Sequence, residues 1–329
     1  MEIKDLAGLS KPAKKLLDII EKSGRGLLAP WQIRRIAKAE KDADLIKFDG
    51  EQRKFELALS TLNQFVDSES KMLVSYSGGQ FQLSLNQVEK RALVRTIATE
   101  AERQANIENI TLLAFNNLNN KSEVSDEPVD KDWVNRFYDT VKDISDDAFQ
   151  LIWSKILAGE VEKPGSFSFR TIDTMKNLSQ TDATLFFELS KYIFEIEDTA
   201  IIPNTGDDDY TNNDYKYNSI LVLADAGLIL SGEHKDLSTS ANIIINGQFA
   251  IVWERNEASP ERTIGGFPLT RAGIELLNIL ERRPADKIFI EKVFKIHAAS
   301  GDKVIYYDKY SVSEGNYLID FDKGINIDF

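Results

Sequence analysis

The stretch from Asp132 to Phe194 constrains the fold more than any other part of the chain, because four amphipathic helices follow one another within it. In the first, apolar residues recur at steps of four, four and three and so share one helix face; they are Trp133, Phe137, Val141 and Ile144. In the second, they fall at i, i+3, i+4, i+7 and i+8, a stripe wide enough to be buried; they are Phe149, Ile152, Trp153, Ile156 and Leu157. Such faces must be covered, so the stretch predicts a compact bundle.

Each expected helix start carries a residue that can accept hydrogen bonds from the first free backbone amides. These residues are Asp132, Ser145, Ser168 and Ser179. Ser179 is followed three residues later by Asp182, which is a capping-box pattern. The local sequence therefore predicts where each of the four helices begins.

The aromatic residues of this stretch allow a second interpretation. Trp133, Trp153 and the pair Phe167 and Phe169 could form an aromatic cage around a ligand. Their helical spacing already accounts for them as core residues, so we expect ordinary packing.

Composition bounds the class of protein. A chain of 329 residues is long enough for two or three domains. Without cysteine it can form neither disulfides nor thiolate metal sites, which fits a reducing cytoplasm. No apolar run approaches the roughly 18 residues of a membrane-spanning helix, and the start lacks the apolar core of a signal peptide. We expect a cytoplasmic protein, with peripheral association at the inner membrane as an option for its N-terminal segment.

Charge is distributed unevenly. The chain has a net charge of −13, but residues 1–41 hold ten Lys/Arg against five Asp/Glu, whereas residues 42–329 hold 30 against 48. Most of the surface should therefore repel nucleic acid, and binding to it is not expected.

The basic N-terminal segment mixes apolar and cationic residues. Arg25, Trp31, Arg34, Arg35 and Lys38 are its candidate contact residues. One interpretation is a helix in an anionic membrane interface, with Trp31 at headgroup depth. The other is a helix that packs on a protein partner, or on the chain itself, with a solvated basic face.

We expect a mainly α protein with a smaller α+β part, divided into four regions. They are basic amphipathic helices at 1–49, a helical region with a long polar helix at 50–120, the central bundle at 130–200, and a winged-helix-like α+β domain with a β-hairpin at 213–329. The long helix, from Gln87 to about Leu118, has a thin apolar seam and predicts a homo-oligomer.

The C-terminal region has a recognisable local pattern. A helix near Tyr217 is followed by two apolar runs around Asn246-Gly247, the strongest short hairpin signal, and by a helix capped by Thr270. This order suggests a winged helix, which usually reads DNA. Between Asp214 and Asp225, however, the only base is Lys216, so phosphate contacts lack donors. A protein-interaction or structural module is the favoured interpretation.

Chemistry-bearing motifs are sparse. Neither His234 nor His297 has a sequence neighbour at metal-ligand spacing, and no nucleotide-binding or nucleophile-elbow motif is present. Asp207 to Asp209 could hold a divalent cation, but the spacing lacks the glycine and terminal glutamate of a calcium loop. We therefore predict no catalytic residue, metal or cofactor.

Several motifs carry a family resemblance. They are Trp153 with Leu157-Ala158, Arg170-Thr171, Leu178-Ser179 with Asp182-Ala183, Ala226-Gly227-Leu228-Ile229, and Leu269-Thr270 with Ala272-Gly273. The segment from Trp133 through Phe187 resembles a family of bacterial proteins catalogued as a domain of unknown function. More loosely, it is similar to the abortive-infection alpha proteins associated with phage resistance. These motifs are specific to a fold, so the resemblance transfers no active-site residue.

The resemblance implies a non-enzymatic phage-defence protein that acts through protein contacts with a partner not yet identified. Two alternatives stay open. One is a DNA-binding regulator that uses residues 214–282, and the other is a metal-dependent hydrolase or nuclease that uses the carboxylates of Asp207 to Asp209.

Overall fold

The computed structural model describes residues 9–23, 74–77, 80–83, 87–205, 215–232, 234–247, 249–256, 261–281, 284–308, 310–313 and 316–327. The chain forms two compact units, unit 1 from Met1 to Gly165 and unit 2 from Ser166 to Phe329. Each unit has its own core, and each is described by itself.

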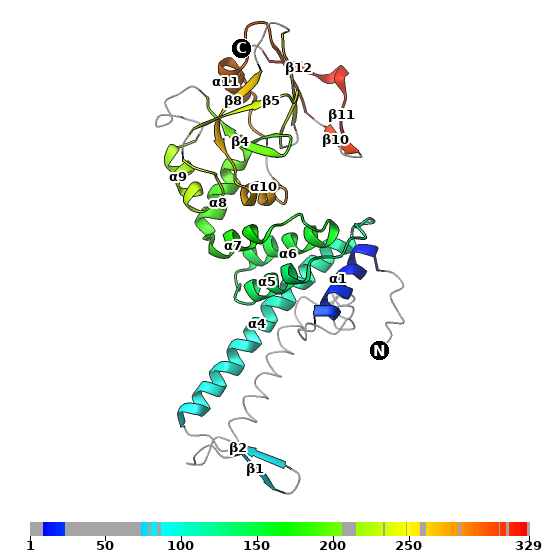
Figure 1. Ribbon diagram of the computed structural model, residues 1–329, viewed down its shortest axis with the longest axis vertical. Coiled ribbons are helices and arrows are strands. Elements are labelled where there is room, and N and C mark those ends of the chain that lie inside the picture. Colours follow the sequence, from blue (N-terminus) through cyan, green and yellow to red (C-terminus); the bar gives the residue numbers. More distant parts are fainter. Residues whose placement is uncertain are drawn as a thin grey trace. The chain divides into compact units, whose positions relative to one another are not determined.

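Unit 1 is helical in its described part, apart from one hairpin (Figure 1). Its elements are α1 (Lys11–Ser23), β1 (Val74–Ser77), β2 (Gln80–Leu83), α4 (Gln87–Asn119), α5 (Lys131–Val141) and α6 (Asp147–Glu162). Strands β1 and β2 pair antiparallel, with Ser77 opposite Gln80.

The core of unit 1 lies where α1, α5 and α6 pack on the C-terminal part of α4. Phe137 is at its centre, with its ring stacked on Trp133 at 5.2 Å and edge-on to Trp153 at 5.6 Å between centroids. All three side chains are buried, as predicted from their helical spacing. Phe167 and Phe169 belong to unit 2.

Two of the expected caps lie at neighbouring residues instead. Helix α5 is capped by Asp130, whose carboxylate accepts from the amides of Asp132 and Trp133, and α6 is capped by Asp146. Asp130 accepts from two of the first free amides of its helix, and Asp146 accepts from one, that of Phe149, so these carboxylates take the role expected for Asp132 and Ser145. Ser168 and Ser179 cap their helices as predicted, and Ser179 forms the full capping box with Asp182.

Unit 2 is built around one antiparallel sheet of eight strands in the order β12-β9-β7-β6-β3-β4-β8-β5. The strands are β3 (Phe194–Ile196), β4 (Thr199–Pro203), β5 (Lys235–Thr239), β6 (Ile243–Asn246), β7 (Phe249–Glu254), β8 (Arg262–Pro268), β9 (Lys303–Tyr307) and β12 (Ile325–Asn326). Its helices are α7 (Phe169–Asn177), α8 (Gln180–Leu189), α9 (Tyr217–Asp225), α10 (Arg271–Leu277) and α11 (Lys287–His297). The remaining elements are a hairpin, β10 (Tyr310–Ser313) with β11 (Asn316–Ile319), and short 3-10 turns at Ser190–Tyr192 and Phe321–Lys323.

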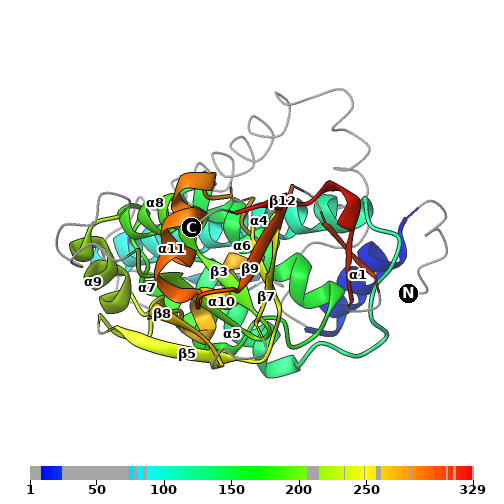
Figure 2. The same cartoon turned by 90° about the horizontal axis from the view of Figure 1, so that it is seen from above.

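Both faces of the sheet are covered. Helix α11 lies alongside the sheet (Figure 2), with the ring of Phe294 edge-on to Trp253 of β7 at 5.3 Å. On the opposite face of β7, Ala250 and Val252 join a cluster against which Tyr310 and Ile319 of the β10–β11 hairpin pack. Burial on both faces explains why β6 and β7 read as nearly continuous apolar runs.

The predicted hairpin at Asn246-Gly247 exists, and β6 and β7 pair from Ile243 opposite Val252 to Asn246 opposite Phe249. The two strands do not form an isolated wing, because β6 also pairs with β3, and β7 also pairs with β9. A winged helix is therefore not confirmed. The fold of the described residues is mixed α+β, with a larger sheet than the sequence predicts. None of the described helices is both long and apolar enough to cross a lipid bilayer.

Candidate partner-binding groove

Helix α1 is fixed to unit 1 at its first residues. The Ser10 hydroxyl donates to the carbonyl of Leu118 at 2.9 Å and accepts from the amide of Ala13, so it caps α1 and ties it to the end of α4. Further along the helix, the apolar face of α1, with Leu16, Leu17 and Ile20, is buried. The other side of α1, which carries its lysines, faces a different part of the chain.

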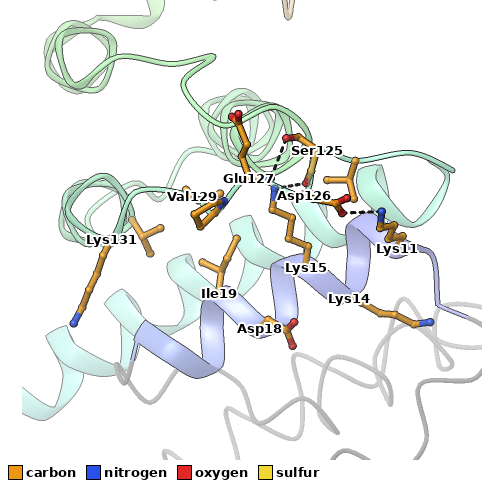
Figure 3. A pocket seen from close by; sticks show the side chains of 13 residues that line it. Lys11, Lys14, Lys15, Asp18, Ile19, Ser125, Asp126, Glu127, Val129 and Lys131 are labelled. Carbon is orange, nitrogen blue, oxygen red and sulfur yellow. Dashed lines mark hydrogen bonds and ion pairs between the residues drawn. The ribbon is translucent and has the colours of Figure 1, made fainter.

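That part is residues 124–129, which we call the strap because it runs along α1 between α4 and α5 (Figure 3). The Lys15 ammonium donates to the carbonyl of Ser125 at 2.8 Å, and the Lys11 ammonium lies 2.8 Å from a carboxylate oxygen of Asp126. The amide of Ser125 in turn donates to the carbonyl of Glu162 at the end of α6. The strap therefore connects α1 to α6.

A groove of about 610 Å³ opens between α1 and the strap, within the range of small-molecule and peptide side-chain sites. The residues that line it are Lys11, Lys14, Lys15, Asp18, Ile19, Val124, Ser125, Asp126, Glu127, Pro128, Val129, Lys131 and Val134. Four lysines and three carboxylates give this lining a net charge of +1, whereas the whole chain has −13. The groove is thus a locally positive place on an acidic protein.

Lys15 is the central cation of the groove. Its side chain is half-buried, and this burial lowers the pKa of its ammonium, although Asp126, Glu127 and Glu160 oppose the change. The neighbouring Asp126 is held by Lys11, whose hydrogen bond lowers the pKa of that carboxyl. An ammonium has three donors, and within the described part of the chain the one hydrogen bond from Lys15 is to Ser125. Two donors are left for a group that enters the groove.

Two predicted site residues come together in a second pocket, which lies in unit 2. Arg170 and Asp182 line a hollow of about 480 Å³ between α7, the start of α8 and the end of α9. The carboxylate of Asp182 already accepts from the amide and hydroxyl of Ser179, at 3.1 and 2.6 Å. Asp182 is therefore a helix cap, and Arg170 is an exposed residue at the rim.

The other predicted residues are placed elsewhere. Trp133, Trp153 and Leu157 lie in the closed core of unit 1. Arg25, Trp31, Arg34, Arg35 and Lys38 lie outside the described residues, as do Asp207 to Asp209. In the described ranges, no three His, Cys, Asp or Glu side chains are grouped so that they could hold a metal ion.

The two histidines, far apart in the sequence, are brought together around Gly265 of β8. The Nδ1 atom of His297 accepts from the Gly265 amide at 3.4 Å, and its Nε2 atom lies 3.1 Å from the carbonyl oxygen of Asn204. A methyl group added at Gly265 would come within 2.5 Å of the His234 ring, which shows how close that ring lies. Burial lowers the pKa of His297, and both of its ring nitrogens are used by backbone groups, so its role is structural.

Lys11, Lys15 and Asp126 are site residues that the sequence analysis did not single out. The one available signal was charge: residues 1–41 are basic, and the segment 119–130 is acidic. Opposite charges do not specify which of many surface carboxylates a lysine will meet, so the pairing needed the structure.

Comparison with family models confirms that the chain resembles a domain of unknown function. Residues 90–293 match the model of one family, described as "Protein of unknown function (DUF2806)". Neither the curated proteins nor the solved structures give a match.

Proposed function

This chain belongs to that family of proteins of unknown function, and on this premise we propose that it is a non-enzymatic bacterial phage-defence protein that works through protein contacts. The defence part of the proposal rests on the motifs that resemble abortive-infection alpha proteins, such as Leu269-Thr270. The contact part rests on one observation, which is the open groove between α1 and the strap.

The composition of the groove suits a protein partner. Ile19 and Val129 are half-buried at its floor, while Lys14 and Lys131 are charged residues of its lining. Protein interfaces combine an apolar centre with a polar rim in this way. A half-buried lysine with free donors adds an anchor that can select a carboxylate.

Phage plating tests the proposal. Bacteria that carry the gene should give fewer plaques than bacteria that lack it, for at least one phage in a diverse panel. A double variant, Lys14→Gln with Lys131→Gln, should restore the plaque count. The matched control, Lys121→Gln with Lys142→Gln, removes the same charge from unit 1 outside the groove and should still defend. Equal plaque counts with and without the gene across the panel would refute the defence function.

Association with an anionic membrane is a second part of the proposal, and it concerns residues beyond α1. The apolar face of α1 is buried inside unit 1, so it does not supply a lipid-binding surface. Contact with lipid would therefore depend on Arg25, Trp31, Arg34, Arg35 and Lys38. Flotation with phosphatidylglycerol vesicles tests this, and the variant Arg34→Gln with Arg35→Gln should float less if lipid binding occurs there.

A homo-oligomer also belongs to the proposal. Helix α4 spans about 50 Å at 1.5 Å per residue, and within its first 22 residues Lys90 is the one buried side chain. A long helix with a mostly polar surface is typically stabilised by a partner helix. Light scattering of the full chain should give a mass above the 37.2 kDa of one copy.

The two alternatives are tested separately. A DNA-binding regulator would have to contact phosphates near α9, where Ile220 and Leu223 are buried and Lys216 is the residue that precedes the helix. A gel shift at low salt would reveal it. A metal-dependent hydrolase or nuclease would lose a divalent-dependent activity when Asp207 to Asp209 are replaced by asparagine.

A further inference from the structure

We infer that the groove between α1 and the strap binds an acidic segment of a partner protein, with a carboxylate of that segment on the Lys15 ammonium. This inference rests on the proposed contact function and adds the chemistry of the partner. It begins from the difference between the four lysines of the groove lining.

Lys11 and Lys15 are the two lysines of the groove that contact the strap. Lys11 is matched by a carboxylate, because Asp126 lies 2.8 Å from its ammonium. Lys15 instead binds a neutral carbonyl, that of Ser125, so its positive charge has no hydrogen-bonded anion in the described residues. Figure 3 shows the Lys15 side chain directed at the strap, between Ser125 and Asp126. A charged ligand group is the natural complement of such an ammonium.

Lys14 and Lys131 extend the positive charge along the lining. Neither ammonium has an ion-pair partner within the described ranges, and each is a side chain that solvent reaches. The opposing carboxylates are those of Asp18 and Glu127, since Asp126 is taken by Lys11. Among the residues that line the groove, the charges left beside the Lys11–Asp126 pair are three cations against two anions, which favours an acidic ligand over a basic one. Glu160, outside the lining, also attracts the Lys15 ammonium.

The apolar floor decides between a small anion and a peptide. Ile19, Val129 and Val134 would leave an inorganic ion or a bare carboxylate without contacts. A segment in which acidic and apolar residues alternate satisfies both the ammonium groups and this floor. The groove therefore fits a peptide that presents one apolar side chain beside each carboxylate.

Fluorescence anisotropy with the full chain tests this inference. The probe is a fluorescein-labelled peptide of alternating glutamate and leucine, and the probe control has glutamine in place of every glutamate. We expect the acidic probe to bind about tenfold or more tightly than the control, because a hydrogen bond between an ammonium and a carboxylate is stronger than one to a neutral amide. Binding should weaken as salt is raised.

Variants then locate the site. Lys15→Gln should weaken probe binding about tenfold or more, Lys15→Arg should restore most of it, and the control Lys142→Gln should leave it unchanged. If Lys15→Gln fails to fold, the variant Lys14→Gln with Lys131→Gln takes its place, since among the described residues neither of these side chains forms an ion pair or hydrogen bond that holds α1. Equal binding of the two peptides, or unchanged binding in the groove variants, would overturn the inference.

Two further outcomes separate the possible occupants and the two proposals. If the probe does not bind but the groove variants dissociate an oligomer in light scattering, the occupant is a second copy of the chain, and the partner-peptide inference is wrong. A protein that reduces plaques without binding the acidic probe would keep the proposed function and lose the inference. A protein that binds the probe through Lys15 without reducing plaques would keep the inference and lose the proposed defence function.

Discussion

Two buried tyrosines, one in each unit, differ in whether the hydroxyl has a hydrogen-bond partner. In unit 1, the hydroxyl of Tyr138 is buried between α4 and α5 without a hydrogen-bond partner among the described residues. Burial raises the pKa of Tyr138 to about 12; the nearby Thr111 hydroxyl opposes this, although the two oxygens do not meet hydrogen-bond geometry. In unit 2, by contrast, the buried Tyr215 hydroxyl donates to the carbonyl of Pro203 at 2.9 Å.

The two tyrosines give a matched pair of predictions. Tyr138→Phe removes a buried hydroxyl without a partner, so the free energy of unfolding should stay the same or rise. Tyr215→Phe leaves a carbonyl unsatisfied and should lower the free energy of unfolding by about 1 kcal/mol. Urea unfolding measures the free energy of unfolding of both variants. An equal loss in the two would contradict the different hydrogen bonding of the two hydroxyls.

His297 predicts how stability depends on pH. Its pKa in the folded state lies below the ordinary value of 6.5 because burial disfavours the charged ring. The unfolded chain therefore binds a proton more readily, and the free energy of unfolding should fall as the pH drops below about 6.5 towards the lowered folded pKa. The hydrogen bond to the Asn204 carbonyl and the charge of Asp236 partly oppose this lowering of the His297 pKa, whereas the nearby His234 adds to it.

Unfolding by urea at pH 7.5 and at pH 5.5 measures this dependence. The difference between the two free energies should be smaller in His297→Gln than in the wild type. Tyr215→Phe, which retains His297, should keep the wild-type difference. An unchanged difference in His297→Gln would assign the pH dependence to other groups.

At the scale of elements, one carboxylate joins α7 to α10. Glu275 is buried on α10, and its Oε2 atom accepts from the amide of Ser168 at 2.6 Å and from the hydroxyls of Ser168 and Thr171. Its Oε1 atom accepts from Arg271 at 2.6 Å. The carboxylate lies at the N-terminus of α7, where the helix dipole favours negative charge.

Glu275→Ala should therefore lower the free energy of unfolding by about 3 kcal/mol, because it leaves the buried Thr171 hydroxyl and the two part-buried donors of Ser168 without this acceptor. Glu291→Ala is the control, since Glu291 forms a partly exposed i,i+4 pair with Lys287 at 3.4 Å and should cost about 0.5 kcal/mol or less. Equal losses in chemical denaturation would show that the link between α7 and α10 contributes little.

Sequence reasoning succeeded for elements that depend on neighbours along the chain. Ser168 and Ser179 cap the helices that follow them, and β6 and β7 form the hairpin expected at Asn246-Gly247. These features follow from hydrogen bonds and backbone preferences that span a few residues. Gly247, for example, has a φ of 61°, which a residue with a side chain adopts at a cost.

At the scale of the whole molecule, the boundary after Gly165 divides the helices that the sequence groups into one bundle at 130–200. Helices α5 and α6 belong to unit 1, and α7 and α8 belong to unit 2. Amphipathic spacing shows that a helix has a face to bury, but it does not show which partner covers that face.

Unit 2 should fold without unit 1, because it has a complete sheet and its own aromatic core around Phe194 and Phe294. A chain of residues 166–329 retains one tryptophan, Trp253, which is 1% exposed. We expect its fluorescence to report one cooperative unfolding transition in urea. A gradual change without a transition would show that unit 2 needs the rest of the chain.

The sequence by itself determined the caps at Ser168 and Ser179, the hairpin of β6 and β7, the unequal charge of the two ends and the family. Only the tertiary structure decided the order of the eight strands, the approach of His234 to His297, and the groove in which Lys15 meets Ser125 across 110 residues. The physical reason is the range of the interactions. Caps and turns are local, whereas strand pairing and the burial of an ammonium depend on which distant surfaces exclude water together.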